Sequence, residues 1–180
     1  GLAESWEQDT ANPKLWRFRL RQGVKFHYGT AFNADAVVWN FDRFFRNDSP
    51  QFDPTGSAIT RGRIPVLASY RKIDEFTVEI ETTRPVSYWP YLMTLVLMTS
   101  PNSFEQGGRD WARTASLPPA GTGPFRLTRF VPRLASDGGL MRISGDPASY
   151  DWATDVNAMA GHHRWQQLDD VRRARSIAGD

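Results

Sequence analysis

Three histidines, His27, His162 and His163, are the side chains in this sequence best suited to binding a transition metal. A zinc site needs three or four nitrogen or sulfur ligands at recurrent spacings, but the sequence has no cysteine and no His-Glu-x-x-His motif. Two of the histidines are adjacent in an irregular segment, which does not provide such a spacing. We therefore expect no metal site, and we interpret all three histidines as solvated loop residues.

Paired carboxylates could support a second kind of chemistry, general acid–base catalysis. Asp74 and Glu75 fall in a predicted turn, and Glu79 and Glu81 alternate with apolar residues along a predicted strand. Acid–base catalysis needs a desolvated cleft, whereas these positions predict solvated side chains. The sequence also lacks the Gly-x-Ser-x-Gly motif of serine hydrolases. We expect no catalytic residue and no enzymatic activity.

The run Gly121-Thr122-Gly123 superficially resembles a phosphate-binding loop. It lacks the Gly-Lys-Ser/Thr ending of a P-loop, and the residues after it predict a strand. A phosphate site of that kind uses the N–H groups and dipole of a helix N-terminus. We therefore expect no phosphate ligand here and no cofactor in the chain.

The composition is typical of a globular domain, with 180 residues, 40% of them hydrophobic and 13% aromatic. The 22 Lys and Arg residues nearly balance the 20 Asp and Glu residues, and the arginines are spread along the chain. We therefore expect no nucleic-acid partner. No apolar stretch approaches the roughly 20 residues of a membrane span. The sequence opens at Gly1 without a leader, so we expect any export signal to have been removed or to lie outside it.

Alternation of apolar and charged residues predicts several strands. The stretch 16–21 alternates strictly, which predicts a half-buried strand. The stretches 70–73 and 76–81 flank a turn and predict an antiparallel hairpin. Further on, a Pro- and Gly-rich turn at 118–124 leads into a predicted strand at 125–131.

The clearest helix signal follows Asn33, a good N-cap residue, over residues 34–46. Its apolar stripe comprises Val37, Val38, Phe41, Phe44 and Phe45. Residues 47–65 are polar and rich in proline, which predicts a long surface loop. A short helix is predicted to begin around Ser87, and residues 95–99 either complete it or form a buried strand.

The aromatic residues divide into two groups. The first group lies on predicted core faces and consists of Trp16, Phe18, Phe26, Phe41 and Phe44. The second group, Tyr88, Trp89 and Tyr91, is interrupted by a proline in a short element. These three side chains either pack in the core or face a ligand cleft.

Several segments, in sequence order, resemble extracellular solute-binding family 5, which comprises the dipeptide-, oligopeptide- and nickel-binding proteins of ABC importers. They are residues 1–6, 16–27, 29–37, 73–80, 85–92 and 121–125. In the central run the family has the pattern F-x-L-R-x-G-V-K-F-H-D-G-T-P-F, and Tyr28 and Ala31 replace its Asp and Pro. The resemblance covers residues 1 to about 133.

This resemblance implies an α/β (α+β-like) fragment: part of the first lobe of a type II periplasmic-binding-protein fold, with a mixed sheet and flanking helices. In such a protein two lobes close over a solute, and a membrane permease recognises the closed form. The implied function is the substrate-binding component of an ABC transporter that captures peptides or similar small solutes. The full-length protein would be monomeric and periplasmic or extracellular, with a lipid anchor as one option.

The resemblance also implies which residues contact the solute, because the corresponding edge of the family's first lobe approaches the cleft. They are Leu97, Thr99, Gly121, Thr122, Gly123 and Phe125. The family's charged anchors for peptide termini lie mostly in the second lobe, so none is assigned here.

The chain departs from the family pattern after Arg133, where residues 134–180 lose its motifs and contain neither Lys nor Phe. We therefore divide the chain into a partial first lobe at 1–133 and a divergent or out-of-frame tail at 134–180. Two other functions stay open. The chain could be an inactive truncated fragment, or the sensor lobe of a transcriptional regulator behind a DNA-binding head.

Overall fold

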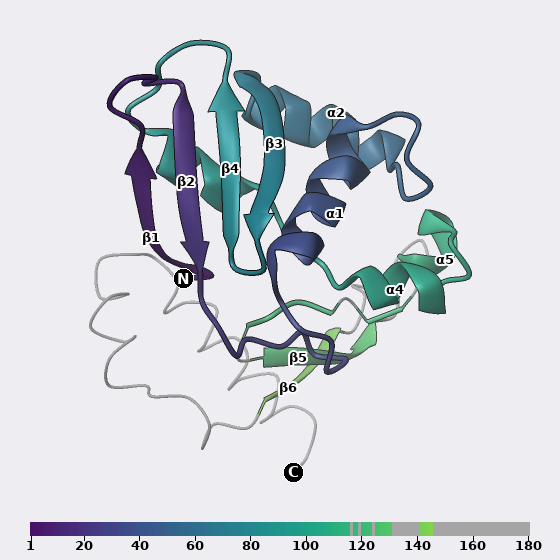
Figure 1. Ribbon diagram of the computed structural model, residues 1–180. Coiled ribbons are helices and arrows are strands. Elements are labelled where there is room, and N and C mark those ends of the chain that lie inside the picture. Colours follow the sequence, from purple (N-terminus) through teal and green to yellow (C-terminus); the bar gives the residue numbers. More distant parts are fainter. Residues whose placement is uncertain (116, 119, 124, 131–140, 146–180) are drawn as a thin grey trace. The chain divides into compact units, whose positions relative to one another are not determined.

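The main sheet is built from strands whose side chains alternate in polarity. The computed structural model describes residues 1–115, 117–118, 120–123, 125–130 and 141–145. The strands β1 (Ala3–Gln8), β2 (Leu15–Leu20), β3 (Leu67–Asp74) and β4 (Thr77–Thr82) lie in the order β1-β2-β4-β3 (Figure 1). The strand and the hairpin predicted from alternation are confirmed.

The inner face of this sheet forms one wall of the core. Trp16, Phe18 and Leu20 of β2 are buried on this face. Phe18 pairs in register with Val78 of β4, and Trp16 pairs with Ile80. The residues between them point to the outer face, as the period of two along a strand requires.

Every pairing in the main sheet is antiparallel, so the expected mixed sheet is wrong for the described residues. Only two residues, Glu75 and Phe76, separate β3 from β4, and such a tight turn allows only an antiparallel return. Antiparallel sheets typically have one buried face and one solvated face. The alternation of apolar and charged residues at 16–21 indicates such a strand. The α/β class itself is confirmed.

Helix α1 (Ala34–Phe45) braces the sheet by packing against β3 and β4 (Figure 1). Its N-cap is Asn33, whose side-chain oxygen accepts a hydrogen bond from the Ala36 N–H at 3.0 Å. In the core, the Phe41 ring stacks on the Tyr70 ring of β3, with 4.9 Å between centroids. The helix predicted from the apolar stripe is therefore confirmed.

The predicted loop at 47–65 is wrong, because helix α2 (Pro54–Arg63) lies within it. Asp53 caps this helix through its side chain, and a proline occupies the first helical position, where no N–H is required. Only Ser57 and Thr60 are buried along α2. The sequence therefore shows no apolar stripe that could have revealed the helix.

Short helices follow the hairpin: α3 (Trp89–Leu92), the 3-10 turn η1 (Met93–Leu95), α4 (Pro101–Gln106) and α5 (Trp111–Thr114). The first of them confirms the short helix predicted near Ser87. Residues 96–99 belong to neither a helix nor a strand, so neither alternative for 95–99 is correct as a whole. No helix in the described part of the chain is long and apolar enough to cross a membrane.

A second, two-stranded sheet is formed by β5 (Phe125–Phe130) and β6 (Met141–Gly145), which pair antiparallel. β5 confirms the predicted strand at 125–131. β6 lies in the segment 134–180, where the sequence predicted no strand. The other residues of that segment, with His162 and His163 among them, lie outside the described residues, so the division of the chain at residue 133 stays a prediction.

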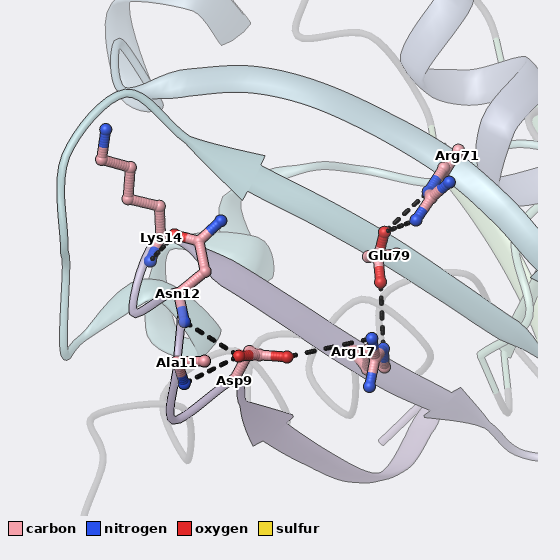
Figure 2. A network of polar contacts seen from close by, with 7 residues as sticks. All are labelled: Asp9, Ala11, Asn12, Lys14, Arg17, Arg71 and Glu79. Carbon is pink, nitrogen blue, oxygen red and sulfur yellow. Dashed lines mark hydrogen bonds and ion pairs between the residues drawn. The ribbon is translucent and has the colours of Figure 1, made fainter.

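The outer face of the main sheet carries a row of charged side chains from three neighbouring strands (Figure 2). Arg17 of β2 and Arg71 of β3 both pair in register with Glu79 of β4. The Glu79 carboxylate accepts hydrogen bonds from Arg17 Nε at 2.9 Å and from Arg71 Nε at 2.6 Å. Glu79 is only 3% exposed. The expectation of a solvated Glu79 is wrong, because two long side chains cover it.

The stabilisation that Glu79 provides through its arginine partners is expected to decrease at low pH. Burial raises the pKa of the Glu79 carboxyl, but the hydrogen bonds from Arg71 and Arg17 outweigh burial and bring the pKa below its ordinary value of 4.5. A carboxyl whose pKa is lowered by folding stabilises the folded state above its unfolded pKa, and that contribution disappears as the pH falls through the folded pKa. We predict that Glu79→Gln makes the free energy of unfolding less dependent on pH below about 4.5.

Urea denaturation from pH 7 to pH 3 measures this dependence. Glu81→Gln, on the same face of the same strand, is the matched control and should keep the wild-type slope of stability against pH. Identical slopes for wild type and Glu79→Gln would contradict the prediction.

Candidate functional site

The turn at 121–123, which contains three of the predicted ligand contacts, is held by the loop at 25–31. The His27 N–H donates to the Gly121 carbonyl at 2.9 Å, and His27 Nε2 lies 2.7 Å from the Gly123 carbonyl oxygen. The Tyr28 hydroxyl donates to the carbonyl of Pro118 at 2.7 Å. Two adjacent residues therefore hold three carbonyls of the segment that forms the turn.

The loop at 25–31 is itself closed by local hydrogen bonds. The Phe26 N–H donates to the Thr30 carbonyl at 2.8 Å, and the Gly29 N–H donates to the Phe26 carbonyl at 2.7 Å. Gly29 has a φ of 83°, a left-handed conformation that favours glycine. The rings of Phe26 and Phe32 pack edge to face in the core, with 5.8 Å between centroids. The loop is thus anchored on both sides of its tip.

The interpretation of His27 as a solvated loop residue is correct only in part: it lies in a loop and is partly exposed, but one ring nitrogen is hydrogen-bonded to the protein and the other is buried. The Gly123 carbonyl can only accept, so Nε2 of His27 carries the hydrogen of their bond. The other ring nitrogen, Nδ1, is buried and has no hydrogen-bond partner among the described residues. The partners lie 96 positions apart in the sequence, which is why no local pattern could identify this contact.

Thr99, another predicted contact, is held at its backbone by Asn40 of α1. The Asn40 amide oxygen accepts from the Thr99 N–H at 3.0 Å, and the Asn40 amide nitrogen donates to the Thr99 carbonyl at 2.9 Å. Asn40 is completely buried. Its position between Val37 and Phe41 on the apolar stripe was a signal that sequence reasoning missed, because a buried amide requires hydrogen-bond partners.

We predict that Asn40→Ala lowers the free energy of unfolding by about 2 kcal/mol, because it leaves the Thr99 N–H and carbonyl without partners. The measurement is urea denaturation followed by tryptophan fluorescence. Asn47→Ala serves as control and should change the midpoint little, because Asn47 is exposed and its side chain accepts one exposed hydrogen bond, from Arg61 at 3.2 Å. A wild-type midpoint for Asn40→Ala would contradict this role of the amide.

The remaining predicted contacts differ in exposure. Leu97 is 69% exposed, Gly121 and Thr122 are partly exposed, and Gly123 is exposed. Residue Phe125 begins β5. The Ser100 N–H donates to the Ala120 carbonyl at 3.0 Å, which places the residue after Thr99 beside the residue before the turn. The structure therefore brings Thr99 close to the turn and leaves the Leu97 side chain open to solvent.

The aromatic alternatives near α3 are resolved residue by residue. Trp89 is fully buried and belongs to the core. Tyr88 and Tyr91 are 53% and 73% exposed, so core packing is wrong for them. Their residues lie one helical turn apart, since the Tyr91 N–H donates to the Tyr88 carbonyl at 3.1 Å.

The chemistry available at the turn is hydrogen bonding and apolar contact. The turn offers backbone N–H groups and the Thr122 hydroxyl, and Leu97 offers an apolar side chain. Within the part of the chain that the structure describes, no three His, Cys, Asp or Glu residues are grouped to hold a metal ion. Such an arrangement suits binding of a polar solute.

A cavity of about 340 Å³ lies elsewhere, on the outer face of the main sheet. It is lined by Asn12, Leu15, Ser69, Arg71, Glu79 and Glu81. Its charged groups already bond to one another or to neighbours: Arg71 pairs with Glu79, and the Ser69 hydroxyl donates to Glu81 at 3.3 Å. We therefore keep the turn, and not this cavity, as the candidate site.

Comparison with known proteins gives a family match over most of the chain. The model described as "Bacterial extracellular solute-binding proteins, family 5 Middle" matches residues 1–136. The chain is 32% identical to the dipeptide-binding protein of Escherichia coli (strain K12), over 72% of this chain and 26% of that protein. It is 35% identical to di/tripeptide-binding protein 2 of Pseudomonas aeruginosa (strain UCBPP-PA14), over the same shares. The chain thus spans about a quarter of the length of these relatives.

Two further similarities bear on fold and function. The HTH-type transcriptional regulator SgrR of Salmonella typhi is 28% identical over 73% of this chain and 20% of that protein. The crystal structure of the dipeptide binding protein from Pseudoalteromonas sp. SM9913 in complex with Met-Leu has a TM-score of 0.63 and 21% identity, and covers 84% of this chain and 31% of that chain. This structural likeness confirms the expected type II periplasmic-binding-protein fold.

Proposed function

We propose, from the premise that this chain belongs to family 5 of the bacterial extracellular solute-binding proteins, that it forms part of the first lobe of an ABC transporter's substrate-binding component. The solutes that it captures are peptides or similar small molecules. The observation that carries this proposal is the family match over residues 1–136. The names of the two bacterial relatives, a dipeptide-binding and a di/tripeptide-binding protein, support peptides as the solute.

In this proposal the turn at 121–123 and the segment at 97–99 form one wall of the solute cleft. Leu97 supplies apolar contact, and Thr99, Gly121, Thr122 and Gly123 supply polar backbone and hydroxyl groups, with Phe125 at the edge. The exposure of Leu97 and the fixed backbone of the turn support this assignment. The opposite wall belongs to a second lobe, as the length of the relatives suggests.

The proposed partners follow from the family. A membrane permease would receive the solute from the closed, monomeric protein in the periplasm or outside the cell, and a lipid anchor would keep it near the membrane. Because the family consists of solute-binding proteins, the proposal assigns binding and no catalysis to this chain.

A second candidate is the sensor lobe of a transcriptional regulator, a class represented among the relatives by SgrR, but that similarity does not favour it over the transporter. That similarity is weaker than the similarity to the peptide-binding proteins, 28% against 32% and 35% identity. The gene upstream of this segment distinguishes the two. A helix-turn-helix there would favour the regulator, and an export signal would favour the transporter.

Equilibrium dialysis of the protein from the complete reading frame against a random mixture of dipeptides and tripeptides tests the proposal. Mass spectrometry of the retained peptides would identify the preferred solutes. We expect saturable retention of peptides and none of free glucose, which serves as control. Failure to retain any peptide would contradict the proposal.

A further inference from the structure

The peptide group that joins Gly121 to Thr122 has a fixed direction. Its carbonyl accepts the hydrogen bond from the His27 N–H at 2.9 Å, so that oxygen points toward His27. In a trans peptide the N–H points opposite to the C=O of the same group, and none of the described peptide bonds is cis. The Thr122 N–H therefore points away from His27. No hydrogen bond joins it to another described residue.

The other end of the turn is fixed in the same way. His27 Nε2 holds the Gly123 carbonyl at 2.7 Å, and the next residue in the sequence, Pro124, has no N–H to offer. One histidine therefore holds the carbonyls on both sides of Thr122. Thr122 lies between these two fixed carbonyls, and its N–H points away from His27.

Gly121 and Gly123 have no side chains that could cover the backbone of this turn. Neither Gly121 nor Gly123 has a φ in the left-handed region, so neither conformation requires glycine. A Cβ at Gly123 would meet no described atom within 4 Å, and a Cβ at Gly121 would meet the Gly123 backbone nitrogen and the His27 ring, each at 4.0 Å, which is ordinary van der Waals contact. Packing within the described residues therefore does not require glycine either. Glycine at such positions lets another molecule approach the backbone closely.

From these observations we infer that the Thr122 N–H donates a hydrogen bond to a carbonyl or carboxylate oxygen of the bound solute, and that His27 is the residue that positions it. An N–H between two fixed carbonyls, with no partner among the described residues, is a preorganised donor, and peptides present acceptor oxygens along their whole length. This inference rests on the proposed peptide-binding function and adds to it the chemical group that the turn recognises.

A matched pair of variants tests the positioning role of His27. The amide nitrogen of a glutamine can replace Nε2 as a donor, whereas the shorter asparagine cannot reach the Gly123 carbonyl. In the protein from the complete reading frame, titrated with a random dipeptide mixture, His27→Asn should weaken the apparent affinity about tenfold. His27→Gln should stay within about threefold of wild type.

Amide NMR of the wild-type protein tests the donor itself and does not depend on the folding of any variant. Saturation with the dipeptide mixture should shift the Thr122 amide proton downfield, as a new hydrogen bond does. An unmoved Thr122 resonance at saturation, or wild-type affinity of His27→Asn, would overturn the inference while leaving the proposed function intact. Absence of any binding by the wild type would overturn both.

Discussion

Replacing Asp53 with alanine is expected to lower the free energy of unfolding by about 3 kcal/mol, because two partly buried groups, the Arg43 guanidinium and the Gly56 N–H, lose their partner together. One carboxylate oxygen caps α2 by accepting from the Gly56 N–H at 2.9 Å. The other accepts from Arg43 at 2.7 and 3.2 Å. Arg43 has only 17% of its side chain exposed, and its guanidinium lies 3.9 Å from the centroid of the Trp111 ring.

The cost is large because Arg43 would remain charged while most of its side chain is shielded from water. Burial lowers the pKa of Arg43, and the hydrogen bond and charge of Asp53 oppose that shift. Without the carboxylate, desolvation of the guanidinium is uncompensated, and the N-terminus of α2 also loses its cap.

Urea denaturation of the 180-residue chain, followed by tryptophan fluorescence, measures this effect. Asp53→Asn keeps an oxygen for the cap and should lie between wild type and Asp53→Ala. Asp48→Ala, which removes the exposed partner of Arg46, is the control and should not move the midpoint. A midpoint for Asp53→Ala that matches the control would show that the buried pair does not stabilise the fold.

Replacing Leu97 with aspartate is expected to weaken peptide binding by the complete protein about 10- to 100-fold without loss of stability. Full burial of a leucine side chain by a solute stabilises a complex by roughly 1.5–3 kcal/mol, which corresponds to that range of affinity. The side chain is 69% exposed in the described fold, so a polar replacement removes little internal packing. Calorimetric titration with the random dipeptide mixture gives the affinity.

Ile73→Asp is the matched control for this variant. Ile73 is an exposed aliphatic residue near the end of β3 and is not among the predicted solute contacts. The Ile73→Asp variant should reduce the affinity for the dipeptide mixture by less than about twofold. Equal affinities for Leu97→Asp and wild type would remove Leu97 from the solute contacts and leave the turn as the remaining candidate.

Local periodicity predicted the elements whose burial is one-sided. The apolar stripe of α1 and the alternation along β2 both arise from one face packed on the core and one face in water, so the sequence pattern predicts them directly. The strand β4 alternates in the same way, although arginines from its neighbours cover Glu79 on its outer face. The cap at Asn33 added the start of the helix. These elements were predicted correctly because their burial and their sequence periodicity have the same cause.

Elements held by polar contacts were missed. Helix α2 buries Ser57 and Thr60 in place of an apolar stripe, and the Ser57 hydroxyl donates to the Phe44 carbonyl at 2.6 Å. Glu79 was expected in water because a carboxylate on a strand's polar face is usually solvated, but Arg17 and Arg71 lie over it from both neighbours. Such burial depends on strand order, which a single sequence does not reveal.

Only part of the candidate site could be predicted from the sequence. The resemblance to the family indicated the segment at 97–99 and the turn at 121–123, and their role as solute contacts stays a prediction. It did not indicate the residues that hold them, His27 and Asn40. Both act across long stretches of sequence, 96 and 59 positions. His27 was interpreted as a solvated loop residue, and Asn40 was given no role.

Small-angle scattering of the protein from the complete reading frame, with and without the random dipeptide mixture, tests most directly whether this fold is one lobe of a closing trap. The account predicts a smaller radius of gyration at saturation with peptide, because the two lobes close over the solute. An unchanged radius in the presence of demonstrated peptide binding would contradict it.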